Sequence, residues 1–225
     1  MRRLVLLFIS VTAISFNLCG QNSQVGLLPE LIATKKLNAN WQITGQLETM
    51  QRMIQEQEAT DFGFDYEFRR TDLTFVGSYR LNPNIKLSGG LLNRFAQGEH
   101  ILRTLQQISL TTRGQSIRFG HRFRTDQTYG ENNTTHRLRY RLSNELPLKG
   151  DNLNLNEWYL KSSLEHLTII RSERVNMEQR INLAFGYLIT NKQRFEVGWD
   201  YRTRSLIDFQ EDFDLWLMLN YYINF

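Results

Sequence analysis

Apolar and polar residues alternate with a period of two along most of this chain. In the stretch RLRYRL, residues 137–142, every arginine falls on one side and every leucine or tyrosine on the other. The stretches INLAFGYLI (181–189) and RFEVGWDYR (194–202) repeat the pattern. A β-strand sorts residues to opposite faces in this way, whereas a helix, with its period of 3.6, does not. The pattern therefore predicts an all-β fold.

Eleven segments carry the alternation, and turn signals separate them. Some connections are tight, such as LNPN, TRGQS and TNKQ, whereas IQEQEATDFGFDY, TDQTYGENNTT and RSLIDFQED are longer, polar and often acidic. PLKGDNLNLNE is the one long connection on the otherwise tight side. Short turns alternating with long loops are typical of antiparallel up-and-down transmembrane β-barrels. The expected strands lie near residues 24–35, 40–53, 67–81, 84–96, 101–113, 116–125, 134–146, 157–169, 177–189, 193–203 and 211–225.

The alternation alone does not say which face meets water, because a soluble ligand-carrier barrel shows the same period with its apolar face inside. Strand length favours a membrane barrel, since about a dozen residues exceeds the ~5–6 of soluble sheets and suits the ~9–11 that cross a bilayer. Aromatic residues, which form girdles at membrane interfaces, lie mostly near the ends of the expected strands. These residues are Trp41, Trp158, Trp199, Tyr140, Tyr201 and Tyr221.

The last strand also favours a membrane barrel. Read in steps of two from Phe213, it is apolar or aromatic throughout, and exposed to water it would be an aggregation hazard. Its end resembles the signal by which outer-membrane proteins are handed to their assembly machinery. We therefore expect this strand to face lipid, and the residues of the assembly signal to be Leu219, Tyr221, Ile223 and Phe225.

The number of expected strands is odd, whereas single-chain bacterial barrels normally have an even number. We expect ten barrel strands, with 211–225 closing antiparallel on 40–53. Residues 24–35 would then lie in the lumen or pair irregularly. The alternative is twelve strands, with a second strand inside residues 54–66.

The N-terminal residues predict export. Arg2 and Arg3 precede an apolar run to Leu18, and Cys19 and Gly20 follow it, which is the order of a secretory signal peptide. The run is shorter than the ~20 residues of a spanning helix, and Leu18 before Cys19 disfavours lipid attachment. We expect a signal peptide at 1–20 and an outer-membrane β-barrel domain at 21–225, located in the bacterial cell outer membrane.

Cleavage after Gly20 changes the composition in two ways. It removes the only cysteine, so a disulfide scaffold is excluded. It leaves 25 Lys and Arg against 23 Asp and Glu. The resulting net charge of +2 is too small to indicate a nucleic-acid-binding protein. The expected partners are outer-membrane lipid and the outer-membrane assembly machinery, with no nucleic acid.

Four arginine-rich motifs resemble, in order, those of the outer-membrane proteins in the domain-of-unknown-function family numbered 2490. They are RFAQGEHILRTLQQ, FGHRFRTDQTY, RLRYRLSNELPL and EWYLKSSLEHL, and the resemblance covers most of the chain after the signal. It implies a signal-bearing outer-membrane barrel. It implies no activity, because the family has none assigned and offers no catalytic residues.

No catalytic, cofactor or metal site emerges from the sequence. His100, His121, His136 and His166 stand in no Ser/His arrangement of a hydrolase. The acidic loop with Glu56, Glu58, Asp61 and Asp65 lacks the spacing of a calcium loop. We therefore expect neither enzyme activity nor a cofactor, and an outer-membrane hydrolase is the least favoured alternative.

The polar faces of the strands predict a luminal charge cluster. Long guanidinium groups paired with carboxylates would fill a lumen of about ten strands, giving a closed structural or interaction barrel. The alternative is a narrow anion-favouring, porin-like path. The same faces also hold Arg80, Arg94 and Glu145. The cluster is Arg118, Arg122, Arg124, Arg137, Arg139, Arg141, Arg180, Arg194, Arg202, Glu165, Glu178, Glu196 and Asp200.

Overall fold

The computed structural model describes residues 23–56, 62–114, 117–130, 134–172, 174–204, 206 and 212–225. The predicted signal peptide, and Glu58 and Asp61 of the acidic loop, lie outside these residues. All eleven expected strands are present: β1 (Ser23–Lys36), β2 (Trp41–Glu56), β3 (Phe62–Asn82), β4 (Ile85–Ala96), β5 (Glu99–Arg113), β6 (Arg118–Tyr129), β7 (Thr134–Pro147), β8 (Trp158–Arg171), β9 (Arg174–Thr190), β10 (Gln193–Arg204) and β11 (Asp212–Asn224).

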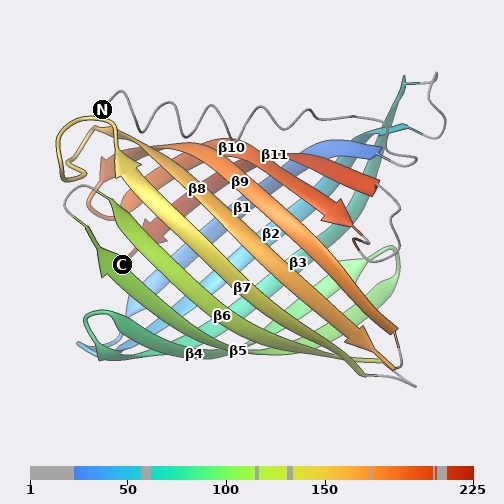
Figure 1. Ribbon diagram of the computed structural model, residues 1–225, viewed down its shortest axis with the longest axis horizontal. Helices are drawn as coiled ribbons and strands as arrows, with labels where there is room; N and C mark the ends of the chain where they lie inside the picture. Colours follow the sequence, from blue (N-terminus) through green and yellow to red (C-terminus); the bar gives the residue numbers. More distant parts are fainter. Residues whose placement is uncertain are drawn as a thin grey trace.

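The strands close into one barrel, in which each strand of β2 to β11 pairs antiparallel with the next along the chain (Figure 1). They are 12 to 21 residues long, so even the shortest exceeds a typical strand of a soluble sheet. The prediction of an all-β, largely antiparallel barrel is confirmed. Within the described residues, no helix is long and apolar enough to cross a membrane.

The predicted strand number is wrong, because β1 is a full member of the barrel. It lies between β2 and β11, antiparallel to β2 and parallel to β11, in a register that runs from Ser23↔Phe213 to Thr34↔Asn224. Residues 24–35 therefore do not lie free in the lumen but pair along their length, with one register shift against β2 between Val25 and Gly26, and β11 does not close on β2. The alternative of twelve strands also fails, since residues 54–56 continue β2 and 62–66 begin β3. With an odd number of alternating strands, one neighbouring pair in a closed barrel must run parallel.

The two ends of the barrel differ less in loop length than the sequence predicts. The C-terminal rim is the end where β11 finishes, with connections 37–40, 83–84, 114–117, 148–157 and 191–192. The N-terminal rim is the end where β1 starts, with connections 57–61, 97–98, 130–133, 172–173 and 205–211. Two connections at the N-terminal rim have only two residues, because strands extend into segments expected to be loops. Gln97 and Gly98 form one of these turns, and both have the positive φ that a tight hairpin requires.

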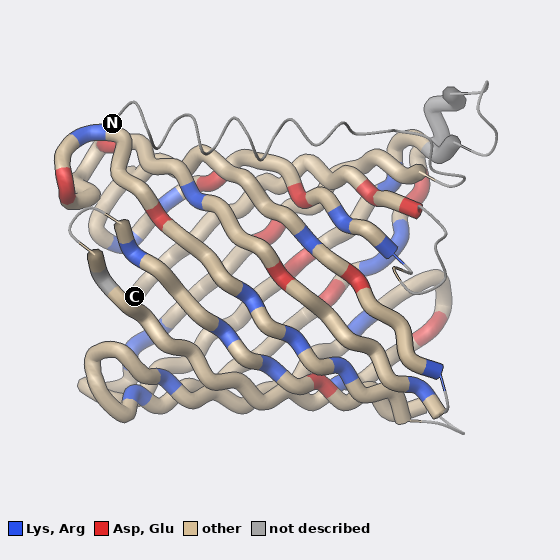
Figure 2. Tube along the Cα trace, viewed as in Figure 1, with Lys and Arg blue, Asp and Glu red and all other residues tan. Residues whose placement is uncertain are grey.

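The outer face of the barrel is apolar and the inner face is charged. Charged residues recur along the whole length of the strands (Figure 2), yet carboxylates such as Glu165 and Asp126 have no exposed surface. This is the reverse of a soluble carrier barrel, which buries its apolar face. Exposed apolar side chains occur on ten of the strands, among them Leu31, Ile43, Phe75, Leu91, Leu102, Ile108, Phe123, Leu138, Leu164, Ile181, Phe185 and Trp199.

Aromatic pairs lie on the outer face near both rims. Trp41 packs on Tyr79 and Trp158 on Tyr187 near the C-terminal rim, each pair with ring centroids 5.0 Å apart. Near the N-terminal rim, the rings of Tyr201 and Phe213 are 5.8 Å apart. Trp41, Trp158 and Tyr201 therefore lie near strand ends as predicted, whereas Trp199 and Tyr140 lie in the middle of their strands.

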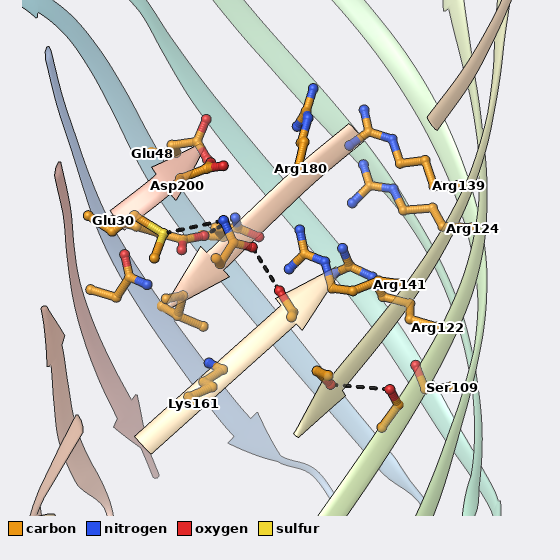
Figure 3. A pocket seen from close by; sticks show the side chains of 18 of the residues that line it. Glu30, Glu48, Ser109, Arg122, Arg124, Arg139, Arg141, Lys161, Arg180 and Asp200 are labelled. Atoms are coloured by element: carbon orange, nitrogen blue, oxygen red, sulfur yellow. Dashed lines mark hydrogen bonds between the residues drawn. The ribbon is translucent and has the colours of Figure 1, made fainter. Parts of the chain in front are cut away.

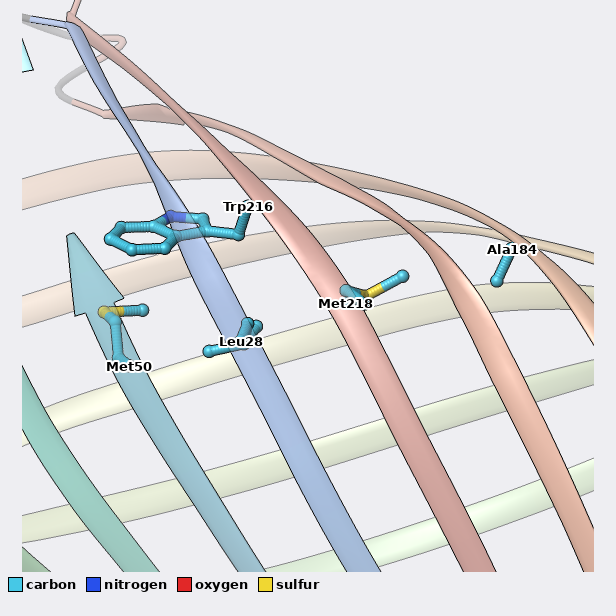
Figure 4. Close-up of a cluster of buried hydrophobic side chains, with 5 residues drawn as sticks. All are labelled: Leu28, Met50, Ala184, Trp216 and Met218. Carbon is cyan, nitrogen blue, oxygen red and sulfur yellow. The ribbon is translucent and has the colours of Figure 1, made fainter. Parts of the chain in front are cut away.

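An apolar cluster fills the lumen beside the parallel pair of strands (Figure 4). Trp216 and Met218 of β11 meet Leu28 of β1 and Met50 of β2, and Ala184 of β9 completes the cluster. The Trp216 ring covers Gly26, where β1 has a register irregularity against β2. A Cβ built on Gly26 would lie 2.6 Å from that ring and 2.1 Å from the backbone oxygen of Gln51. Only glycine allows this approach of β1 to its neighbours.

We expect Gly26→Ala to destabilise the barrel at this closure, because the added methyl overlaps backbone as well as the Trp216 ring. Overpacking of this kind costs about 1–3 kcal/mol. Gly45→Ala on β2 is the matched control, since its Cβ would sit 3.7 Å from Phe75, an ordinary contact. The measurement is the urea midpoint of the refolded barrel. Equal midpoints for the two variants would contradict the tight closure.

Candidate functional site

The lumen contains a cavity of about 780 Å³ lined mainly by polar and charged side chains. Fourteen lysine and arginine residues line it, against seven aspartate and glutamate residues. The lining reaches the C-terminal rim at Thr34, Thr111, Arg118 and Asn224. Every strand of the barrel contributes to the lining, because residues of one parity on each strand point inward.

Glu165 of β8 is the centre of the luminal ion pairs. Its Oε2 accepts hydrogen bonds from Arg122 Nη2 at 2.7 Å and Arg141 Nε at 2.8 Å. Its Oε1 lies 3.6 Å from Arg139 Nη1 and 3.9 Å from Arg180 Nη1. The carboxylate has no exposed surface, so these cations replace the water that would otherwise solvate it. One acidic group thereby joins strands β6, β7, β8 and β9.

Asp126 of β6 extends this network toward the N-terminal rim. It also has no exposed surface, and its two oxygens lie 2.6 Å from Arg124 Nε and 2.8 Å from Arg139 Nε. Arg139 is therefore shared between Asp126 and Glu165. The register explains the sharing, because Arg124 faces Arg139 directly and Arg141 faces Glu165 across neighbouring strands.

Further ion pairs lie along the rest of the lumen. Arg94 donates two hydrogen bonds to Asp72, at 2.7 and 2.6 Å, in a bidentate pair. Arg70 bridges Asp72 at 3.4 Å and Glu48 at 3.1 Å. Other pairs join Arg202 to Asp200, Arg180 to Glu178 and Arg194 to Glu145.

Glu196 of β10 forms a separate group near the C-terminal rim. Lys161 donates to both of its oxygens, at 2.9 and 2.8 Å, and Tyr159 and Tyr222 each donate a hydroxyl hydrogen bond to it. The Arg194 guanidinium lies 4.3 Å from the centroid of the Tyr222 ring, in a cation–π contact. Glu196 is 1% exposed and is fully bonded.

Charge is unevenly distributed around the cavity. Figure 3 shows Glu30, Glu48 and Asp200 on one side, facing a wall that holds Arg122, Arg124, Arg139 and Arg141. Glu30 accepts a hydrogen bond from Gln46. The arginine wall carries more guanidinium donors than Glu165 and Asp126 can accept, so part of its positive charge faces the cavity.

The predicted luminal residues point inward, but they form several groups. Arg122, Arg139, Arg141 and Arg180 gather on Glu165, and Arg124 bonds Asp126. Arg118 instead lies at the C-terminal rim, half-exposed and 3.8 Å from Glu145, and Arg137 bonds the Thr128 hydroxyl. The six arginines that β6 and β7 contribute to the predicted cluster therefore do not form one patch.

Several luminal residues were missed by the sequence reasoning. Alternate residues of a strand point to the same face, so two of them could have been predicted from the sequence. Asp126 lies two residues after Arg124, and Lys161 lies four residues before Glu165. The same signal would have added Glu30, Glu48, Arg70, Asp72, Arg103 and Tyr159. Their partners depend on the register between strands, which the alternation does not encode.

The residues of the predicted assembly signal lie at the C-terminal rim. Leu219, Tyr221 and Ile223 belong to β11, and their neighbours Asn220 and Tyr222 point into the lumen. Phe225 follows the strand, is 65% exposed, and donates its backbone N–H to the oxygen of Thr34 at 2.9 Å. The last residue is thus tied to β1.

The histidines lie apart from the main ion pairs. His121 Nδ1 is 3.0 Å from the hydroxyl of Tyr140, and His166 Nε2 is 3.4 Å from that of Thr168. Over the part of the chain that the structure describes, no three His, Cys, Asp or Glu residues gather as metal ligands would.

Fold and lumen together define a closed β-barrel with an apolar outer face and an ion-paired interior. The chain belongs to the family described as "Protein of unknown function (DUF2490)", whose model matches residues 26–223. Among solved structures, LpxR from Salmonella typhimurium is similar, with a TM-score of 0.50 and 8% identity over 82% of this chain and 83% of that chain. At that identity the likeness concerns the fold alone. No curated protein sequence matches the chain.

We expect Glu165→Gln to destabilise the barrel strongly. The substitution keeps the size of the side chain but leaves four arginines around a neutral amide. Removing one partner of a buried ion pair costs about 3–5 kcal/mol. Glu99→Gln, at an exposed position of β5, is the control. The free energy of unfolding in urea gives the comparison, and a Glu165→Gln barrel as stable as the control would contradict the network.

Proposed function

We propose that this protein is an outer-membrane β-barrel whose lumen is closed by its arginine–carboxylate network. It would act as a structural or interaction barrel, without a catalytic step. The observation that carries the proposal is the full burial of Glu165 and Asp126 among arginines, in the middle of a lumen whose outer wall is apolar.

Two features support a location in the outer membrane. The exposed apolar residues on the outer face match what lipid requires, and aromatic pairs lie toward both rims as at membrane interfaces. The expected signal peptide at 1–20 and the apolar strand ending at Phe225 add export and assembly signals. Outer-membrane lipid and the outer-membrane assembly machinery are therefore the partners of the proposal.

The packing toward the N-terminal rim supports a closed lumen. Gln24, Arg52 and Asp214 are inward residues near that rim, and they are only 8%, 8% and 7% exposed. They do not line the cavity, although Arg94, Ile169 and Arg202, each two residues from a strand end at the same rim, do. The apolar cluster around Trp216 fills part of the same half. Together with the ion pairs across the lumen, this packing supports a barrel that conducts no steady current.

A narrow anion-favouring pore is the second candidate. The observation in its favour is the excess of lysine and arginine over carboxylates along the cavity, since charged linings select ions of opposite sign. Such a path would have to open through the packed half of the lumen.

Conductance separates the two candidates. We expect purified wild-type barrel to carry no steady current in planar bilayers. Arg139→Leu should also carry none, yet unfold at a lower urea concentration, because Asp126 and Glu165 lose a partner 2.8 and 3.6 Å away. Arg118→Leu, at a half-exposed rim position, is the control for unfolding. A stable, anion-preferring wild-type current that Arg139→Leu reduces would establish the pore instead.

A charge on the outer face tests the membrane location. Leu164 lies in the middle of β8 and is 50% exposed, so Leu164→Arg would place a guanidinium in lipid. We expect a loss of about 2–4 kcal/mol when the barrel unfolds from lipid vesicles. Leu148→Arg, in the connection at the C-terminal rim, should have little effect. No loss in Leu164→Arg, or spontaneous solubility of the folded barrel without detergent, would argue against the membrane.

A further inference from the structure

Arg103 and Arg137 form an arginine pair in the half of the lumen nearer the N-terminal rim. Arg103 on β5 faces Thr128 on β6, and Arg137 on β7 faces Asp126, two residues before Thr128. Arg103 is only 3% exposed, so its charge is almost fully removed from bulk water. Both side chains line the cavity.

Both guanidinium groups bond the same neutral oxygen. Arg103 Nε donates to the Thr128 hydroxyl oxygen at 2.9 Å, and Arg137 Nη1 donates to it at 2.6 Å. Because both distances end at the same oxygen, the two donor nitrogens lie at most 5.5 Å apart. Two positive charges at that separation repel each other, and a threonine hydroxyl carries no charge to offset them.

These two arginines differ from the other strongly buried arginines of the lumen. Among the described residues, no carboxylate oxygen lies within the 4.0 Å of an ion pair from either guanidinium, whereas Arg94 bonds Asp72 and Arg202 bonds Asp200. Asp126 is on the same inward face as Thr128, but its ion pairs are with Arg124, 2.6 Å from one oxygen, and Arg139, 2.8 Å from the other. Buried charges are normally paired, so this pair lacks an anion.

We propose that Arg103 and Arg137 bind an oxyanion, the phosphate or carboxylate group of a small solute. A planar guanidinium group can form paired hydrogen bonds with either a phosphate or a carboxylate group. The bonds to Thr128 use one N–H of each arginine, so the remaining N–H groups can bind the ligand. A cavity of about 780 Å³ is of the size that holds small molecules, and it leads from the pair to the C-terminal rim. The inference goes beyond the structural role, because the site holds whether or not the barrel conducts.

Calorimetric titration of the detergent-purified barrel tests the site. Inorganic phosphate and sodium acetate are added in separate arms, in a buffer of low ionic strength, to tell the two oxyanion groups apart. We expect saturable 1:1 binding in at least one arm and a higher thermal unfolding midpoint with that anion. Arg103→Gln should weaken binding at least tenfold and abolish the anion-dependent rise. Arg118→Gln, which removes a half-exposed luminal charge, should bind as wild type.

Arg137→Gln provides a second variant in case Arg103→Gln does not fold, and it should weaken binding in the same way. Wild-type protein that binds neither anion would overturn the proposal. So would unchanged binding in both variants, or a loss as large in Arg118→Gln, which would show general charge attraction. None of these readouts involves current, so failure here is distinct from failure of the closed-barrel proposal.

Discussion

The burial of a carboxylate in the middle of the lumen is the constraint on which this barrel depends. An ionised Glu165 without water is stable only if cations and hydrogen bonds replace its hydration. Arg122 on β6, Arg139 and Arg141 on β7 and Arg180 on β9 all meet it, so its requirement is fulfilled only when four neighbouring strands are in register. The network and the register of β6 to β9 therefore depend on each other.

On the opposite side of the lumen, apolar side chains pack against one another. Where β1 meets β11 in parallel, the inward residues Trp216, Met218 and Leu28 form an apolar cluster. Parallel pairing is slightly weaker per residue than antiparallel pairing, and the Trp216 ring packed over Gly26 adds apolar contact there. The backbone bond from Phe225 to Thr34 ties the end of the chain to the same strand. Apolar packing thus adds to the ion pairs of the lumen where the barrel closes.

The sequence predicted all the strands and the inward parity of their charges, because a period of two is a property of each strand alone. It could not predict the position of β1, since alternation does not say which strands are neighbours, and the rule of even strand numbers pointed away from the parallel pair. For the same reason it found Arg139 and Glu165 but not their contact, which follows from the register of β7 on β8. Asp126 and Lys161 had the right parity, yet they were overlooked because arginine dominated the pattern.

A double-mutant cycle on Glu165 and Arg141 tests the network most directly, because these side chains share a 2.8 Å bond and stand opposite each other on neighbouring strands. The free energies of unfolding of wild type, Glu165→Gln, Arg141→Gln and the double variant give their coupling energy. The account predicts a coupling of at least about 1 kcal/mol, within the range for contacting charged residues. Losses that add to within about 0.5 kcal/mol, as for distant and independent sites, would contradict it.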